Sequence, residues 1–261
     1  IGSTAVEVLN APPVGAIHAP EFVDEGERFT VTVEAVDPGD DPVLFDWDVT
    51  GDGGYDLVNS IDTDQTLVFG QEGDITITVR AHDRDGGETL LNALVHVLNQ
   101  EPVAELTIPD QVVEGADTPV SCRAIDAGAD ALSYAFDFDG DNIYDIEGLG
   151  EGMASHVYDD QGFFTVTCAV DDGSNVVTIS RLVIVENAPP RVTLRSDAPV
   201  DEGGLVHLTA TVADPSVTDT VTVEWDLDGD GVFDVRDDPA LERDIPANDD
   251  ARFLVTIVAR D

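Results

Sequence analysis

Hydrophobic and polar residues alternate with a period of two in short runs along the whole chain. Such alternation places one face of each run in a core and the other in water, which is the pattern of a β-strand. Turns rich in Gly, Pro and Asp separate the runs, and the 3.6-residue period of an amphipathic helix is absent. The early and late runs are residues 29–36 and 75–81, 120–125 and 164–170, and 206–212 and 253–259. The pattern predicts an all-β fold built from β-sandwiches.

The runs recur with a period of about 90 residues, which indicates tandem repeats. Asn- and Pro-containing phrases at residues 9–13, 98–102 and 186–190 mark the boundaries, and a Val-(Asp)-Glu-Gly turn follows each of them. We therefore predict repeats at residues 10–98, 99–187 and 188–261, in an elongated array of three domains. Residues 1–9 are predicted to hold an orphan last strand, and the third repeat is predicted to lack its last strand.

The unmatched ends allow two interpretations. The chain can be a window from a longer array of repeats. Alternatively, residues 3–8 of one subunit can complete the third repeat of the next, which would give a filament by strand donation. An uncovered sheet edge promotes aggregation, so either interpretation requires something to cover it.

The composition is strongly acidic, with 55 acidic residues against 11 basic ones, all of them Arg, and a net charge of −44. Asp outnumbers Glu 39 to 16, which suits turns and cation-binding loops. Nucleic acid and anionic membranes are poor partners for such a surface, whereas divalent cations are good ones. A salt-adapted protein with a hydrated acidic surface is the alternative. No apolar stretch is long enough to predict a membrane span.

An aspartate-rich phrase occurs once in each repeat. Residues 225–234 read Trp-Asp-Leu-Asp-Gly-Asp-Gly-Val-Phe-Asp, residues 136–145 are closely similar, and residues 47–56 have Thr50 in place of one Asp. Acidic side chains fall at positions 1, 3, 5 and 9, counted from the first Asp, with Gly between or just after them. Calcium takes six to eight oxygen ligands at about 2.3–2.6 Å, which short Asp side chains on a tight loop can supply. The phrases predict three Ca2+ loops.

These features resemble the polycystic-kidney-disease-type (PKD) repeat, whose members are immunoglobulin-like sandwiches of extracellular proteins. The loops are also similar to the calcium loops of integrin-type blades and dockerins, in which position 7 adds a carbonyl. The resemblance implies the following ligands: Asp48, Asp52 and Asp56; Asp137, Asp139, Asp141, Asp145 and the Ile143 carbonyl; Asp226, Asp228, Asp230, Asp234 and the Val232 carbonyl. Thr50 and a shifted Gly weaken the expectation for the first loop.

The only two cysteines, Cys122 and Cys168, lie in the inward register of an early and a late strand. Immunoglobulin-type sandwiches link their two sheets at such positions beside an inward aromatic residue, for which Phe136 is the candidate. This resemblance implies a disulfide and an oxidising compartment. Two buried apolar thiols are the alternative.

The residues favour a calcium-binding, extracellular or cell-surface array that serves as a spacer, an adhesive stalk or a filament subunit. The alternative is a non-catalytic accessory module that binds polysaccharide or protein for a secreted enzyme. Expected partners are neighbouring repeats of the same or an identical chain, and cell-surface or matrix components. No catalytic motif is present, so we expect no enzyme activity.

The position of the calcium ions is open. If the repeats stack in tandem, residues 48–56 would approach Asp126 and Asp130, and residues 137–145 would approach Asp214 and Asp219. Calcium could then lie at such meeting points, or it could stay inside each loop.

Overall fold

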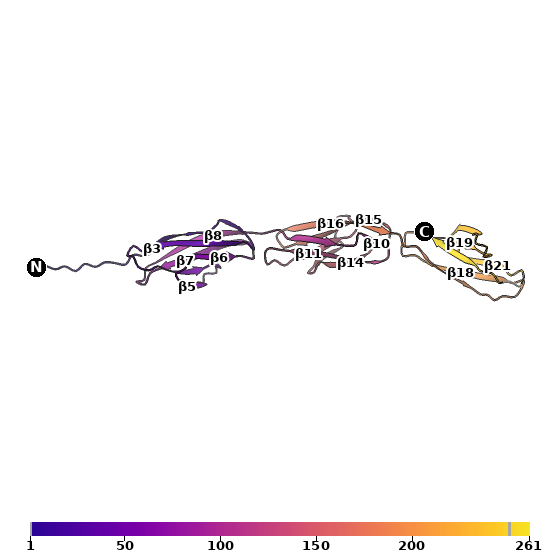
Figure 1. The fold of residues 1–261 in the computed structure, drawn as a ribbon, viewed down its shortest axis with the longest axis horizontal. Coiled ribbons are helices and arrows are strands. Elements are labelled where there is room, and N and C mark those ends of the chain that lie inside the picture. The colour runs from indigo at the N-terminus through magenta and orange to yellow at the C-terminus, as the bar shows by residue number, and fades with distance from the viewer. Residues whose placement is uncertain (1, 250–251) are drawn as a thin grey trace. The chain divides into compact units, whose positions relative to one another are not determined.

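The computed structural model describes residues 2–249 and 252–261, and its regular elements within these residues are all β-strands (Figure 1). Ile1 of the predicted first segment, and residues 250 and 251 of the third repeat, lie outside the described residues. The prediction of an all-β fold is confirmed.

The first repeat holds eight strands in two sheets. One sheet has the order β1-β3-β6 and the other has the order β2-β8-β7-β4-β5. The strands are β1 (Val14–His18), β2 (Phe22–Asp24), β3 (Arg28–Val36), β4 (Leu44–Asp48), β5 (Leu57–Ser60), β6 (Asp64–Val68), β7 (Gly73–His82) and β8 (Glu88–Leu98). Inward residues of both sheets form one core around Trp47, which is fully buried together with Val31 and Val79. This arrangement is a β-sandwich.

The second repeat has the same strand order, with sheets β14-β11-β9 and β10-β16-β15-β12-β13. Its strands are β9 (Val103–Thr107), β10 (Gln111–Val113), β11 (Asp117–Ile125), β12 (Ser133–Asp137), β13 (Ile146–Leu149), β14 (Met153–Val157), β15 (Gly162–Asp171) and β16 (Val176–Glu186). The predicted early and late strands at 120–125 and 164–170 are parts of β11 and β15.

The third repeat has sheets β17-β18-β21 and β20-β19-β22. Its strands are β17 (Arg191–Ser196), β18 (Leu205–Ala213), β19 (Thr222–Asp226), β20 (Val235–Asp238), β21 (Glu242–Pro246) and β22 (Thr256–Arg260). The late strand was predicted from residue 253 but begins at Thr256. In the other repeats, β2 and β10 pair in parallel with the last strands β8 and β16. The third repeat has no such last strand among its described residues, and its turn at 200–203 forms no strand.

Residues 2–13 also form no strand, and the apolar side chains of Val6 and Val8 are exposed. The predicted orphan strand at the start is therefore not formed by this chain alone. Its pairing with another repeat, and the division at residues 9, 98 and 187, stay predictions.

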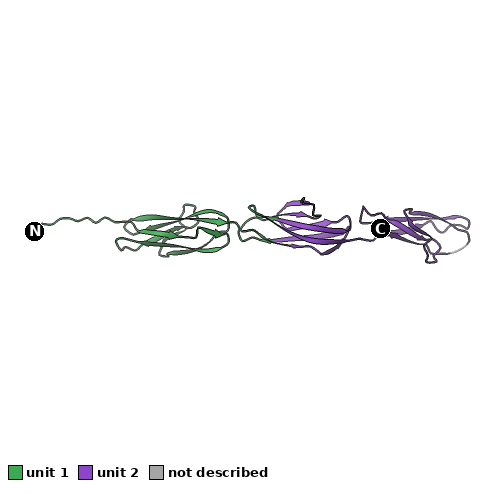
Figure 2. Cartoon of the chain, turned by 90° about the horizontal axis from the view of Figure 1, so that it is seen from above, with its two compact units in different colours: residues 1–104, 124–133, 170–177 green, residues 105–123, 134–169, 178–261 purple. Residues whose placement is uncertain are grey.

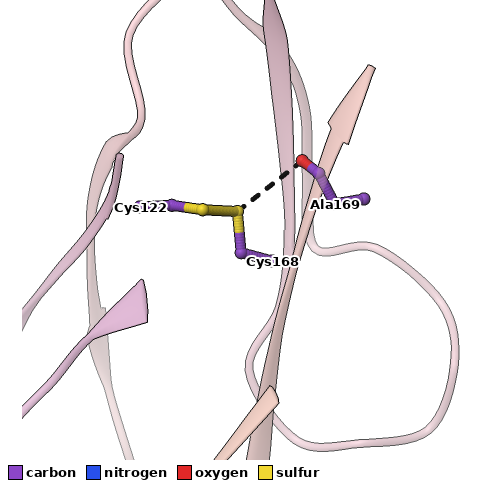
Figure 3. The surroundings of a disulfide bond; sticks show 3 residues. All are labelled: Cys122, Cys168 and Ala169. Carbon is purple, nitrogen blue, oxygen red and sulfur yellow. Dashed lines mark hydrogen bonds between the residues drawn. A yellow bond between two sulfur atoms is a disulfide. The ribbon is translucent and has the colours of Figure 1, made fainter. Parts of the chain in front are cut away.

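A disulfide joins Cys122 on β11 to Cys168 on β15, across the two sheets of the second repeat (Figure 3). Their Cα atoms lie 6.5 Å apart, and both residues are buried beside Phe136, which is itself fully buried. The Cys168 sulfur lies 3.6 Å from the Ala169 carbonyl oxygen, a contact rather than a donated bond because a disulfide sulfur carries no hydrogen. The predicted pairing is confirmed.

The chain forms two compact units (Figure 2). Unit 1 contains residues 1–104 together with two loops of the second repeat, residues 124–133 and 170–177, drawn in green with it. Unit 2 contains residues 105–123, 134–169 and 178–261. Some loops of the second repeat therefore belong to the same compact unit as the first repeat, and this grouping brings distant acidic residues together.

Candidate cation sites

Each aspartate loop begins on the last residue of a central strand. Asp48 ends β4, Asp137 ends β12 and Asp226 ends β19, and all three are buried next to a core aromatic residue. The strand fixes the first carboxylate, so the loop that follows is built around it.

Backbone N–H groups surround this first carboxylate. In the second repeat, Gly140 N–H donates to Asp137 Oδ1 at 2.7 Å and Asn142 N–H donates to Asp137 Oδ2 at 3.0 Å. At the far end of the loop, Phe138 N–H donates to Asp145 Oδ2 at 2.7 Å. Asp226 and Asp234 make the same bonds in the third repeat, and Asp48 and Asp56 make them in the first. Every loop is thus closed by its own backbone.

Two positions of each loop have left-handed backbone conformations, which explains the recurrent Gly. Gly229 and Gly231 have φ of 77° and 85°, and Gly140 and Asn142 have 81° and 68°. Gly adopts these values without strain, and Asn tolerates them better than most residues. The tight winding brings the acidic side chains to one side.

The structure brings together three of the predicted carboxylate ligands in two of the loops. One oxygen from each of Asp137, Asp139 and Asp141 lies within 4.8 Å of the others, and the same holds for Asp226, Asp228 and Asp230. Among the described residues, Asp145, Asp234 and the trio Asp48, Asp52 and Asp56 join no such group. The side chains of Ile143 and Val232 are exposed, and the ligand role of their carbonyls stays a prediction.

A further acidic group, the Glu25 cluster, consists of Glu25, Asp126 and Asp130 in unit 1. Glu25 follows β2, and its N–H donates to the carbonyl of Leu98 at the end of β8 at 3.0 Å. Its Oε1 accepts a bond from Gln100 N–H at 2.9 Å. The side chain is only 2% exposed.

The Glu114 cluster consists of Glu114, Asp214, Asp219 and Asp261 in unit 2. Glu114 follows β10 as Glu25 follows β2, and its Oε1 accepts a bond from Ala188 N–H at 3.0 Å. It too is 2% exposed. The same arrangement thus occurs twice in the chain, one repeat apart.

Burial and like charges raise carboxyl pKa values in both clusters. Burial contributes most to the raised pKa of Glu25, the Gln100 N–H opposes it, and the charges of Asp130, Asp126 and Glu72 add to it.

The pKa of Asp219 is raised first by burial and then by Asp160, Asp214 and Asp261. Asp46, another buried acid, shows the opposite result. Burial raises its pKa, but the Asn59 N–H and the Arg80 guanidinium outweigh that effect and lower it.

The expectation that residues 48–56 and 137–145 approach the aspartates of the next repeat stays a prediction, while the acidic groups of the structure join those aspartates to other residues. Asp126 and Asp130 meet Glu25, and Asp214 and Asp219 meet Glu114; no group among the described residues joins them to the aspartate loops. Both glutamates lie in the predicted turns, and no ligand role was predicted for them. The recurrence of Val-(Asp)-Glu-Gly after each boundary phrase was the signal that could have found them.

Two sheets packed around an aromatic core, repeated along the chain, define a protein of immunoglobulin-like β-sandwich repeats. A family model described as PKD domain matches residues 99–185. The predicted resemblance to PKD repeats is therefore confirmed for residues 99–185; the same strand order recurs in the first repeat, and the aspartate loop recurs in the first and third repeats.

A curated relative, chitinase A from Pseudoalteromonas piscicida, is 26% identical over 215 residues. The match covers 79% of this chain and 26% of the relative, so the chain spans about a quarter of that protein's length.

Similar solved structures include the PKD domain of an M14-like peptidase from a Thermoplasmatales archaeon. It is 18% identical with a TM-score of 0.30, and the match covers 34% of this chain and 98% of that one. Fibronectin(III)-like modules of Clostridium thermocellum CbhA are 15% identical with a TM-score of 0.31, over 65% of this chain and 94% of that one.

Across residues 2–249 and 252–261 there is no helix with the length and apolar character needed to cross a membrane.

Proposed function

We propose that the chain is a calcium-binding, extracellular structural segment that acts as a spacer, a stalk or a filament subunit of a larger surface protein. The observation that carries this proposal is the repeated convergence of three loop aspartates, at Asp137, Asp139 and Asp141 and again at Asp226, Asp228 and Asp230. Oxygens within 4.8 Å of one another can share one ion whose ligands lie about 2.4 Å away.

The chemistry of the donors fits calcium. All the grouped ligands are carboxylates, which are hard oxygen donors, and neither loop contains the His or Cys that zinc prefers. The loop backbone is already closed by Asp137 and Asp226, so a cation would add to an ordered loop rather than create one. Mutual repulsion of the carboxylates falls when a doubly charged ion binds, and this links calcium binding to stability.

The extracellular location is supported by the disulfide, since such bonds persist in oxidising compartments. An adhesive role, with cell-surface or matrix components as partners, belongs to the same proposal. Pairing of residues 3–8 with another copy's third repeat would give the filament form.

The test is calcium titration of the full chain by calorimetry, combined with thermal melting in calcium and in chelator. We expect calcium uptake and a higher melting temperature in calcium. The variant Asp139→Asn/Asp228→Asn should lose loop-bound calcium and keep its fold, because an Asn side chain still offers an oxygen to the Asp141 and Asp230 N–H groups. Identical uptake by the variant and the parent chain would contradict the assignment of calcium to the loops.

A second candidate is a non-catalytic accessory module of a secreted enzyme, which the similarity to chitinase A favours. Sugar-binding modules of this kind commonly present aromatic rings to the polymer. The exposed aromatic residues among those described are scattered: Phe22 on β2, Tyr55 in the first aspartate loop, Phe163 on β15 and Phe253 before β22. This scatter favours the structural role, and a pull-down of the chain with insoluble chitin distinguishes the two.

A further inference from the structure

Glu25 and Glu114 each keep one carboxylate oxygen without any partner. Both side chains are 2% exposed, and after Asp46 they are the most buried acids among the described residues. The Oε1 atom of each accepts one backbone N–H, whereas the buried Oε2 atom of each accepts no hydrogen bond. A buried charged oxygen without a partner is strongly unfavourable, so these positions require something more.

The groups that face the two glutamates are acids in the same condition. Asp126 accepts Gly128 N–H at 2.8 Å and Asp130 accepts Gln71 Nε2–H at 2.7 Å, each through Oδ1, while their buried Oδ2 atoms have no partner. In the Glu114 cluster, the Oδ2 atoms of Asp214 and Asp219 are likewise buried and unpartnered. Within the described parts of the chain, no arginine or histidine forms an ion pair with any of these acids.

Asp46 is a buried carboxylate whose positively charged partner, Arg80, belongs to the protein itself. It is 1% exposed, accepts Asn59 N–H through Oδ1, and accepts the Arg80 Nε–H at 2.9 Å through Oδ2. Glu25 is buried to the same degree in the same unit and has no arginine. The difference indicates that the counter-charge of the Glu25 cluster comes from outside the chain.

We propose that each cluster is a calcium site: Glu25, Asp126 and Asp130 hold one ion, and Glu114, Asp214, Asp219 and Asp261 hold another. One oxygen of every member lies within 4.8 Å of one oxygen of each other member, which is about twice a calcium–oxygen distance. The donors are all carboxylates, and a doubly charged ion offsets two of the negative charges in each cluster, whereas a shared proton would offset only one. Water and nearby carbonyls can complete the coordination.

The Asn99 side chain carries another buried oxygen without a partner in unit 1. Its Nδ2 donates to Asp172 Oδ2 at 3.1 Å, while its Oδ1 is buried and has no hydrogen-bond partner. Asn99 precedes Gln100, whose N–H donates to Glu25. A neutral oxygen without a hydrogen-bond partner therefore lies one residue along the chain from a residue that contacts the cluster.

An ion at the Glu25 cluster would fasten the loop of residues 126–130 onto the turn of residues 23–26. The two segments already touch, because a Cβ on Gly26 would meet the Ala127 carbonyl oxygen, and a Cβ on Gly128 would lie 2.6 Å from Glu25 Cδ. The ion would therefore act as a clamp inside unit 1, and its counterpart would act inside unit 2. This role goes beyond the proposed loop sites, since none of its ligands is a loop aspartate.

The third repeat contains a matched control. Glu202 occupies the same place in the turn at residues 200–203, but it is exposed and belongs to no acidic group among the described residues. The turn at residues 200–203 forms no strand and has no last strand to pair with among the described residues, so the Glu-Gly phrase alone does not bury the glutamate. Burial accompanies the aspartates that face Glu25 and Glu114.

The experiment measures calcium stoichiometry of the full chain by calorimetry and by equilibrium dialysis, for the parent chain and for Glu25→Gln, Glu114→Gln and Glu202→Gln. We expect each of the first two variants to bind one calcium ion fewer, and Glu202→Gln to bind as many as the parent. In chelator, Glu25→Gln and Glu114→Gln should melt at a higher temperature than the parent, because a neutral amide removes the unpaired charge. The contrary result is that Glu25→Gln and Glu114→Gln bind as many calcium ions as the parent chain and still melt at a higher temperature in chelator. That result would show that the acids share protons, and it would overturn the proposal.

The same titrations separate this proposal from the loop sites. Loss of calcium in Asp139→Asn/Asp228→Asn but not in the glutamate variants overturns the clamps alone. Loss in the glutamate variants but not in the loop variant supports the clamps and overturns the loop sites. A parent chain that binds no calcium overturns both.

Discussion

The loop of residues 137–145 and the Glu25 cluster both gather three carboxylates, yet their surroundings differ. In the loop, Asp139 and Asp141 are exposed and each accepts a backbone N–H from the residue two positions on. In the cluster, three residues from two distant segments keep one buried oxygen each without a partner. The number of carboxylates close together therefore does not by itself indicate that a cation is needed. A buried oxygen that lacks a hydrogen-bond partner is the better criterion for a cation site.

The difference also concerns how each group forms. A loop is local, so its carboxylates meet as soon as the strand ends and the glycines turn. A cluster needs the turn at Glu25 and the loop at Asp126 to be packed together, which depends on folded sheets on both sides.

Removing the disulfide should give the largest loss of stability. The double variant Cys122→Val/Cys168→Val copies the residues of the first repeat, Val33 and Val79. The bond closes a segment of 46 residues, so its loss should lower the unfolding free energy by about 4 kcal/mol. Denaturant titration measures this, with reduced parent protein as the control. An unchanged midpoint would contradict it.

The variant Gly128→Ala should disturb the Glu25 cluster without changing any charge. A methyl group there would lie 2.6 Å from Glu25 Cδ, so the far end of this buried side chain would have to shift, and we expect a loss of about 1 kcal/mol. The matched control is Gly150→Ala, because a Cβ at that position meets nothing within 4 Å, and its effect should stay within about 0.5 kcal/mol. Melting of both variants gives the comparison, and equal shifts would refute the close packing.

The variant Thr50→Asp should make the first loop resemble the other two. Asp48, Asp52 and Asp56 do not converge as their counterparts do, and Thr50 occupies the position of Asp139 and Asp228. Because ligand charge tunes calcium affinity, we expect an added site or about tenfold tighter binding at this loop. Thr50→Asn supplies the oxygen without the charge and serves as the control. Calorimetry that shows no gain for Thr50→Asp would argue against the ligand pattern.

The smallest effect on stability is expected at Asp244, an exposed carboxylate that pairs with a histidine of the same chain. Asp244 Oδ1 lies 2.7 Å from His207 Nδ1, and this bond raises the pKa of His207. The stability that it adds is fully present below pH 6.5, the ordinary pKa, and is lost as the pH rises through the higher folded pKa. NMR titration should show the His207 pKa falling in Asp244→Asn. Calcium should leave this pKa unchanged, in contrast to the clusters.

Most of the fold could be predicted because its signals are local. Alternation over residues 29–36 requires one face of a strand to be buried, and Trp47, Phe136 and Trp225 recur at the equivalent buried position. The aspartate loops are short enough for spacing and Gly placement to decide their shape. The start of the last late strand was predicted three residues early, because apolar residues at 253–255 extend the pattern beyond the paired segment.

The strand pattern, the repeat, the inward cysteines and the carboxylates that each loop gathers could be predicted, since they depend on residues close together in the chain. The folded structure was needed to show that Glu25 and Glu114 are buried and that one oxygen of each is left without a hydrogen bond. It was also needed to identify the acids that meet them, which are Asp126, Asp130, Asp214, Asp219 and Asp261. Burial and hydrogen-bond satisfaction are properties of segments about a hundred residues apart once they are packed together. The recurrent Val-(Asp)-Glu-Gly phrase marks the candidate glutamates but does not specify their burial, since Glu202 in the same phrase is exposed.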